Sequence, residues 1–412
     1  MSDKFDIVII GGGLVGATLA LALAPLKLKI AIVETQTEHQ FQHSHLEVRS
    51  LALAYGGAQI LRGLGLWEFI QPQVNPILNI HVSDRGHFGM TRLSADKTHV
   101  DALGYVIEIP VLLSVLYQQL ALSSVKQFSP ATLLQLDQAS DQVTLLIETE
   151  GVKKSISAKL VLGADGGKST VRQLLAIESH EHDYEQVAIV SNIRLKRPHL
   201  NQAYERFTAD GPLALLPLSD NRMSIIWTVK QDRVAGFLAQ SDAEFLSNLQ
   251  LAFGYRAGRF EAIGARQTYP LKQLKVNSHY RSRVGLIGNS AHSLHPVAGQ
   301  GFNLSMRDIA GLVSIIADKH YQGIDLDETV FERYVALREA DHAIMLKVTD
   351  TLVKVFSTQS FIWSLPRNIA LHKVERLSPI KHEINKLMMG VRGRLNRLAR
   401  GLPLEQDCAT YD

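Results

Sequence analysis

A glycine pattern near the start of the chain constrains its fold most strongly. The pattern GxGxxG directly follows the apolar run 5–10, which we predict to be a buried strand. Residues 14–26 are expected to form a helix with small residues on one side, and residues 28–33 a second strand. Strand, turn, helix and strand in this order make a βαβ unit, which implies a parallel sheet. The three glycines are Gly11, Gly13 and Gly16.

This spacing predicts a dinucleotide site. The first glycine allows a tight turn, the second lets the backbone approach a pyrophosphate, and the third lets the helix pack on the strand. The helix start offers free N–H groups and a positive dipole to phosphates. Glu34 lies 18 residues after Gly16, at the end of the second predicted strand. A carboxylate there accepts hydrogen bonds from both ribose hydroxyls and repels a 2′-phosphate, which excludes the adenosine of NADP. FAD and NAD remain open, and a glycine-rich structural turn is the alternative.

A second motif follows the strand expected at 155–162. Residues 163–172 read GADGGKSTVR, which contains the pattern DGxxSxxR. The pattern places the acid, Asp165, at a turn near a cofactor pyrophosphate. An Asx turn that caps a helix is the alternative.

A third motif follows a buried strand expected at 284–287. Residues 288–303 read GNSAHSLHPVAGQGFN and precede a helix that we expect to start near Leu304. A reduced flavin carries negative charge around N1, and the N-terminus of a helix aimed there stabilises that charge.

These three motifs, in this order, resemble those of the single-component aromatic-ring flavoprotein monooxygenases, and among them the ubiquinone-biosynthesis hydroxylases. Residues 205–217 resemble the substrate-domain strands of that family. GQGFNLSMRD at 299–308 is most similar to the 2-polyprenyl-6-methoxyphenol hydroxylase branch.

The resemblance implies an α/β fold with three parts. A Rossmann-like FAD-binding domain of the glutathione-reductase type carries an inserted antiparallel β-sheet substrate domain and a helical C-terminal region. Composition shifts near residue 180, where short strands begin, and the chain is mostly helical beyond Leu304. We therefore expect the FAD-binding domain at 1–72, 100–180 and 270–325, the substrate domain at 73–99 and 181–269, and the helical region at 326–412.

The resemblance also assigns cofactor contacts by position. Asn289 stands where the wider class usually has aspartate; its amide can bond a ribityl hydroxyl but brings no negative charge. Ile109 and Pro110 stand where relatives often have arginine or asparagine, so no contact is expected there. The other positions are Gly11, Gly13, Gly16 and Glu34 for the AMP half, Arg49 near the phosphates and ribityl chain, Asp165 and Gly166 for the acid–glycine pair, and Pro296, Gly301 and Asn303 along the isoalloxazine edge.

The implied reaction converts a polyprenylated (methoxy)phenol of ubiquinone biosynthesis, O2 and NADH or NADPH into a hydroxylated phenol and water, through a flavin hydroperoxide. The flavin supplies the difficult chemistry, and the protein supplies position and a dry site. Only one GxGxxG occurs, so the nicotinamide is expected to visit the flavin transiently. The residues do not separate NADH from NADPH, and they leave the ring position, prenyl length and oligomeric state open.

No catalytic acid or base is assigned from the sequence. His292 and His295 are candidates for activating the phenol, although a packing role suits His292 better. A zinc site that adds His43 and His45 to them is not expected, because no carboxylate or cysteine completes it at the usual spacing. We predict no metal.

Composition bounds the location and the partners. The net charge of +3 is too small to argue for nucleic acid. A single cysteine, Cys408, and the lack of a long apolar run indicate a cytoplasmic protein. Between residues 381 and 400, six Lys or Arg oppose one Glu. Apolar residues recur there at helical spacing, namely Ile384, Leu387, Met388, Val391, Leu395 and Leu398.

Such a basic amphipathic segment suits the cytoplasmic face of the inner membrane, where a polyprenylated substrate resides. A helix packed on the body with a solvated basic face is one alternative. A docking site for another enzyme of the ubiquinone pathway is another.

Three other functions share parts of this pattern. A sibling hydroxylase would act at another ring position, and a flavoprotein reductase of prenyl double bonds would share the fold. A halogenase is disfavoured because residues 363–366 (WSLP) only faintly echo the WxWxIP signature. A non-enzymatic escort for prenylated cargo is disfavoured by the third motif.

Overall fold

The computed structural model describes residues 3–37, 40, 49–357, 368, 372–393 and 395–404. Most of the polar loop expected at 36–48, with His43 and His45, lies outside these residues, as do residues 363–366, Arg394 and Cys408.

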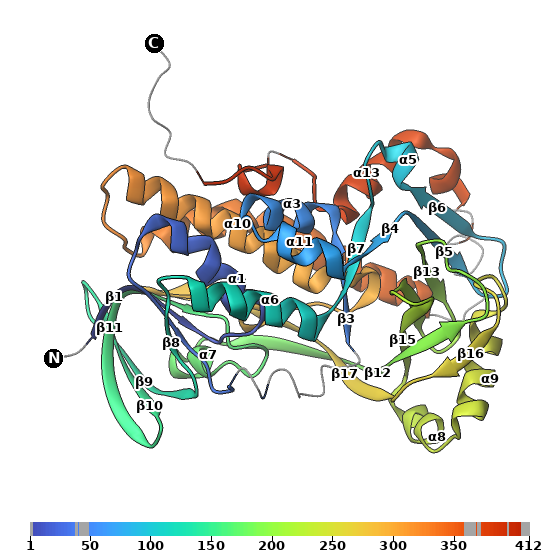
Figure 1. The fold of residues 1–412 in the computed structure, drawn as a ribbon, viewed down its shortest axis with the longest axis horizontal. Coiled ribbons are helices and arrows are strands. Elements are labelled where there is room, and N and C mark those ends of the chain that lie inside the picture. Colours follow the sequence, from blue (N-terminus) through green and yellow to red (C-terminus); the bar gives the residue numbers. More distant parts are fainter. Residues whose placement is uncertain are drawn as a thin grey trace, which may run out of the picture.

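The first sheet carries the predicted βαβ unit at the blue end of the chain (Figure 1). Strand β1 (Asp3–Ile10) pairs in parallel with β2 (Ile30–Val33) and with β11 (Val152–Gly163). Helix α1 (Leu14–Leu23) connects β1 to β2, and a 3-10 turn over Ala24–Leu26 completes the expected helix. The sheet is extended by β8 (Lys126–Phe128), β19 (Val284–Leu286) and β18 (Tyr280–Arg281), and by the meander of β9 (Ala131–Gln138) and β10 (Val143–Thr149) on β11.

The second sheet lies at the opposite end of the molecule (Figure 1). All its pairs are antiparallel except β13 with β5, which are parallel. The expected antiparallel sheet is wrong at this one pair, because β5 arrives from an early segment and no hairpin sets its direction. The strands are β5 (Asn79–Asp84), β6 (Met90–Ser94), β12 (Ser179–Leu195), β13 (Gln202–Phe207), β14 (Pro212–Pro217), β15 (Arg222–Lys230), β16 (Phe260–Ile263), β17 (Gln267–Val276) and β20 (His292–Ser293).

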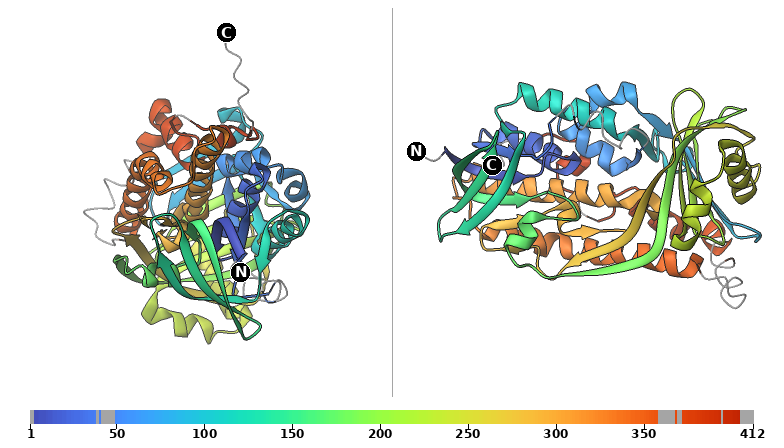
Figure 2. Two further views of the ribbon diagram at one scale, coloured as in Figure 1. Left: turned by 90° about the vertical axis from the view of Figure 1, so that its left-hand side faces the viewer. Right: turned by 90° about the horizontal axis from the view of Figure 1, so that it is seen from below.

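The long paired strands β12 and β17 connect the two halves, as the view from below shows (Figure 2). Strands β17 and β20 carry the second sheet beyond residue 269. The division of the chain into domains therefore stays a prediction, since the sheet itself crosses one of its expected boundaries.

The two faces of the second sheet have different neighbours. On one face, α8 (Val234–Leu238) and α9 (Asp242–Phe253) bury a core that includes Trp227 and Phe245. The capping box predicted from Ser241 and Glu244 is present at the start of α9. The other face is turned toward the first sheet and the C-terminal helices.

Helices cover the first sheet and separate it from the C-terminal part (Figures 1 and 2). Helix α10 (Gln300–Tyr321) packs on α1 and on α11 (Thr329–Ser357). It begins four residues before the expected start, because Gly299 takes a left-handed conformation (φ +60°) that ends the preceding turn. The remaining main elements are α3 (Tyr55–Gly63), α6 (Ile109–Leu122), α7 (Thr170–Leu174), α13 (Ser378–Met388) and a small sheet of β3 (Ser50–Ala54), β4 (Asn75–Ile77) and β7 (Gly104–Glu108).

None of the helices described here is both long enough and apolar enough to span a bilayer.

Candidate functional site

A cavity of about 940 Å³ reaches from the glycine motifs to the inner face of the second sheet. Its walls come from the start of α1, from β3, from the loop before α10 and from five strands of the second sheet. The structure thus brings together many of the predicted cofactor residues. Those lining the cavity are Gly13, Arg49, Gly166, Asn289, Pro296, Gly301 and Asn303.

The three motif glycines divide into two packing positions and one open position. A Cβ on Gly11 would lie 2.6 Å from the Ala164 carbonyl oxygen, and a Cβ on Gly16 would lie 1.9 Å from the Gly11 carbonyl oxygen. A Cβ on Gly13 would meet nothing within 4 Å among the residues that the structure describes. The first and third glycines therefore allow close backbone packing, while the second leaves room at the start of α1 for a phosphate group.

Glu34 is buried at the end of β2, as its spacing predicted. Its carboxylate accepts hydrogen bonds from the backbone N–H groups of Gly12 and Gln36. Glu34 therefore holds the glycine turn in place in addition to any ligand contact. Tyr117 on α6 supports the same turn by donating to the Gly12 carbonyl at 3.0 Å. The sequence reasoning missed Tyr117, whose hydroxyl is a polar tip on an otherwise apolar helix.

In the second motif Asp165 has both of its expected characters. One carboxylate oxygen, Oδ2, accepts from the Val171 N–H at 3.0 Å and so caps α7. The other, Oδ1, is buried and has no partner among the described residues. An orphaned buried oxygen at this turn fits a hydroxyl donor from a bound cofactor.

Arg172 joins the second and third motifs. Its guanidinium donates to the Ser290 carbonyl at 2.9 Å and to the Gly167 carbonyl at 2.7 Å, and the side chain is buried. The sequence placed this arginine in the motif but assigned it no role. Its two bonds show that it holds the two glycine-rich turns against each other.

Asn303 lies at the cavity wall, yet its amide is already committed to backbone. It donates to the carbonyls of Ala52 and Gly299, both at 2.8 Å, and accepts from the Ala54 N–H at 2.7 Å. Any contact of Asn303 with a flavin would therefore come from its backbone. Pro296 and Gly301 line the cavity beside it.

Arg49 lies across the cavity, with its guanidinium 4.5 Å from the centre of the Tyr269 ring. Burial raises the pKa of Tyr269, although Arg49 acts to lower it. A cation held flat on an aromatic face suits an anionic phosphate or the ribityl region of a cofactor.

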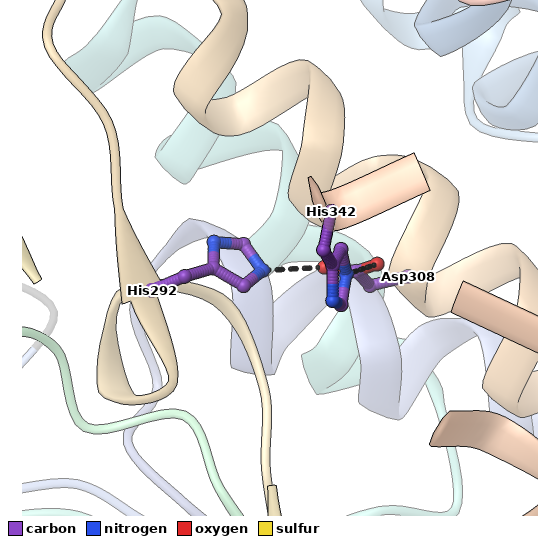
Figure 3. A group of neighbouring side chains, drawn as sticks. All are labelled: His292, Asp308 and His342. Carbon is purple, nitrogen blue, oxygen red and sulfur yellow. Dashed lines mark hydrogen bonds and ion pairs between the residues drawn. The ribbon is translucent and has the colours of Figure 1, made fainter. Parts of the chain in front are cut away.

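The two candidate histidines are buried and lie outside the cavity lining. His292 contacts Asp308 of α10, which also contacts His342 of α11 (Figure 3). The distances from the histidine nitrogens to the Asp308 oxygens are 2.9 and 2.7 Å. His295 accepts from the Val297 N–H and contacts Gln186, and burial lowers its pKa to about 4. The packing interpretation of His292 therefore fits best.

His292, Asp308 and His342 could by distance hold a metal ion. However, the Arg338 guanidinium donates to Asp308 Oδ1 at 2.8 Å, so a cation there would face a positive group on the same carboxylate. Burial alone would raise the pKa of Asp308, but His342 and Arg338 hold it well below its usual range. We interpret the group, here called the Asp308 cluster, as a buried ion-pair network that joins the third motif to α11.

Fold and site together define a flavoprotein with the architecture of the FAD-dependent aromatic hydroxylases. A family of sequences described as "FAD binding domain" matches residues 4–345, and the chain belongs to this family, among its ubiquinone-biosynthesis hydroxylases. It is an FAD-dependent aromatic-ring monooxygenase.

Two curated relatives span almost all of the chain. It is 33% identical to ubiquinone hydroxylase UbiL of Rhodospirillum rubrum, over 97% of this chain and 93% of the relative. It is 30% identical to the 3-demethoxyubiquinol 3-hydroxylase of Escherichia coli, over 94% of this chain and 98% of the relative. Among solved structures, p-nitrophenol 4-monooxygenase PnpA of Pseudomonas putida has the same fold (TM-score 0.79, 18% identity, 96% of this chain and 100% of that one).

Proposed function

We propose that this enzyme hydroxylates the ring of a polyprenylated methoxyphenol in ubiquinone biosynthesis, using O2 and transiently bound NADH or NADPH. The observation that carries the proposal is the single cavity that joins the glycine motifs to the second sheet. The names of the relatives favour a ubiquinone precursor as the substrate class.

The described residues fit FAD in one orientation. Gly13 and the start of α1 would receive the pyrophosphate, and Glu34 the adenosine ribose. The free Asp165 oxygen, together with Gly166, Arg49 and Asn289, would contact the pyrophosphate and ribityl chain. Pro296, Gly301 and the Asn303 backbone would border the isoalloxazine. When bound, FAD supplies the activation of O2 and the electrophilic oxygen that enters the ring.

The rest of the cavity suits an aromatic ring with an apolar tail. Its far wall consists mainly of aliphatic side chains from the second sheet and the C-terminal helices, which would exclude water from the reacting atoms. Members of this wall include Val190, Leu216, Ile226, Leu352, Ile384 and Met388.

The E. coli relative's name gives a second candidate, a sibling hydroxylase acting at another ring position. Anaerobic addition of NADH or NADPH, followed through the visible flavin spectrum, tests both. We expect fast bleaching only with a short-chain prenyl methoxyphenol, and a product heavier by one oxygen after air is admitted. Equal bleaching without the phenol would point to a reductase. Placement of the new hydroxyl by NMR would separate the two hydroxylases.

We also propose that the enzyme binds peripherally to the cytoplasmic face of the inner membrane, or to another enzyme of the ubiquinone pathway, through exposed basic residues of segment 381–404. The apolar residues of this segment pack on the protein: Ile384 and Met388 line the cavity, and Leu398 is fully buried. Membrane attraction would thus rest on charge, from exposed residues such as Arg392 and Arg400.

Sedimentation with phosphatidylglycerol vesicles tests the membrane proposal. Arg392→Glu with Arg400→Glu should release the protein, while the matched exposed pair Arg194→Glu with Arg259→Glu should not. Equal sedimentation of all three proteins would remove segment 381–404 from the membrane proposal.

A further inference from the structure

Glu205 is the only carboxylic acid among the described residues that line the cavity. Along β13, side chains alternate between the two faces of the sheet. Ala203, Glu205 and Phe207 share the cavity side, whereas the Tyr204 ring packs edge-on against Phe253 on the other face (centroids 5.3 Å apart). The strand register therefore aims one acid into the site from the substrate side.

The neighbours of Glu205 within the sheet are apolar. Val82 on β5 and Ala214 on β14 lie directly across from it, and both line the cavity. No salt bridge to Glu205 is present among the described residues. A carboxylate in such surroundings is poorly solvated and therefore reactive toward a proton donor.

One backbone group contacts the Glu205 carboxyl. The N–H of Ala298, in the third motif, donates a hydrogen bond to it. Ala298 and Gly299 are consecutive left-handed residues, both at φ +60°. For alanine this conformation costs on the order of 1 kcal/mol, so the fold maintains it against strain. The contact ties Glu205 to the loop that we propose borders the isoalloxazine.

Burial raises the pKa of Glu205 to about 7, while the bond from Ala298 acts to lower it. Both protonation states are then populated near neutral pH, as a general base requires. The cavity's other titratable side chains are Arg49, which stacks on Tyr269, and Lys272. On α11 the nearby Asp350 is paired with Lys354.

We propose that Glu205 is the catalytic base that accepts the phenolic proton of the substrate; this inference rests on the proposed hydroxylase function. The phenol O–H bond breaks and its electron pair stays on the oxygen, while an O–H bond forms on the Glu205 carboxylate. The phenolate donates electron density to the ortho and para ring carbons, where an electrophilic oxygen attacks. The proton returns to water when the product leaves.

Glu205→Gln isolates the proton transfer, because the amide oxygen can still accept from Ala298. With a short-chain prenyl methoxyphenol we expect kcat/KM to fall about 100-fold while the FAD content is unchanged. The wild-type kcat/KM should rise with pH and level off above about 7, and this acid limb should be absent in Glu205→Gln. Glu205→Asp, which keeps a carboxyl group, should recover part of the rate.

A matched control makes the same change elsewhere in the second sheet. Glu261→Gln on β16 alters an exposed residue 3.8 Å from Arg194 and should keep wild-type kinetics and pH profile. A series of fluorinated prenyl phenols then separates chemistry from packing. Phenols already ionised at the assay pH should lose only a few-fold in Glu205→Gln, because they need no base.

Equal losses for ionised and un-ionised phenols, or a wild-type rate in Glu205→Gln, would overturn the assignment of Glu205 while leaving the proposed function intact. A wild-type enzyme that hydroxylates no phenol would overturn both.

Discussion

Two carboxyl groups flank the third motif in opposite surroundings. Asp308 is fully buried on the side of α10 and α11, where Arg338, His292 and His342 contact it (Figure 3). Glu205 lies on the cavity side, among apolar neighbours and with one backbone donor. The same fold thus holds one acid ionised by compensating partners and the other close to neutrality by their absence. A compensated acid suits structure, and an uncompensated one suits proton transfer.

Removing the charge of Asp308 should have the largest effect. Asp308→Asn leaves the buried Arg338 without its main partner, which costs about 3–5 kcal/mol of unfolding free energy. Urea denaturation measures this loss. Asp325→Asn, an exposed partner of Lys159, is the matched control and should leave the midpoint unchanged. A midpoint for Asp308→Asn close to wild type would mean that the cluster is not structural.

The glycines extend the comparison from charge to space. Gly13→Val points into the open cavity, so we expect a folded protein with FAD affinity at least about 100-fold weaker, or about 2.7 kcal/mol. Gly16→Val meets the Gly11 carbonyl and should fail to fold stably. Flavin absorbance per chain and circular dichroism check the pair. Full FAD retention in a folded Gly13→Val protein would refute the position proposed for the pyrophosphate.

The two acids should respond to pH with opposite signs. Glu205 has an ordinary pKa of 4.5 and a folded pKa of about 7, so the folded state holds its proton longer and stability falls as pH rises from about 4.5 to 7. Glu205→Gln should therefore gain on wild type over that window, by on the order of 2–3 kcal/mol. Asp308 has a lowered pKa, and its contribution is complete above 3.8 and lost only as pH falls below that value.

Melting curves of both proteins between pH 4 and 8, with equal FAD, measure this difference. A constant gap between Glu205→Gln and wild type would mean that Glu205 is ordinarily solvated, and the contrast with Asp308 would disappear.

Glu34 belongs to both kinds of environment and should show the smallest effect. Glu34→Gln keeps one oxygen for the Gly12 N–H but removes the charge offered to a ribose. We expect FAD to bind about 10-fold more weakly, or about 1.4 kcal/mol, with little change in melting temperature. Fluorescence titration of FAD into the stripped protein measures it, beside Glu261→Gln. Unchanged affinity would assign Glu34 to the glycine turn alone.

Local features were predictable because neighbours along the chain decide them. The strand 5–10, the glycine turn and the Ser241–Glu244 capping box follow from residue order and are present in the structure. The start of α10 was misplaced, because it depends on the backbone conformation of Gly299, which the tertiary contacts of the loop set. The parallel pairing of β5 with β13 escaped for a similar reason, since about 120 residues separate the two strands.

The sequence by itself determined the βαβ unit, the family and the cofactor class, because the spacing of glycines and acids carries that information. Only the tertiary structure decided which acid is compensated. Asp308 meets Arg338 30 residues away, and Glu205 meets Ala298 across 93 residues. Burial and partners set the pKa of a carboxyl group, and both are properties of the folded environment that no local pattern encodes.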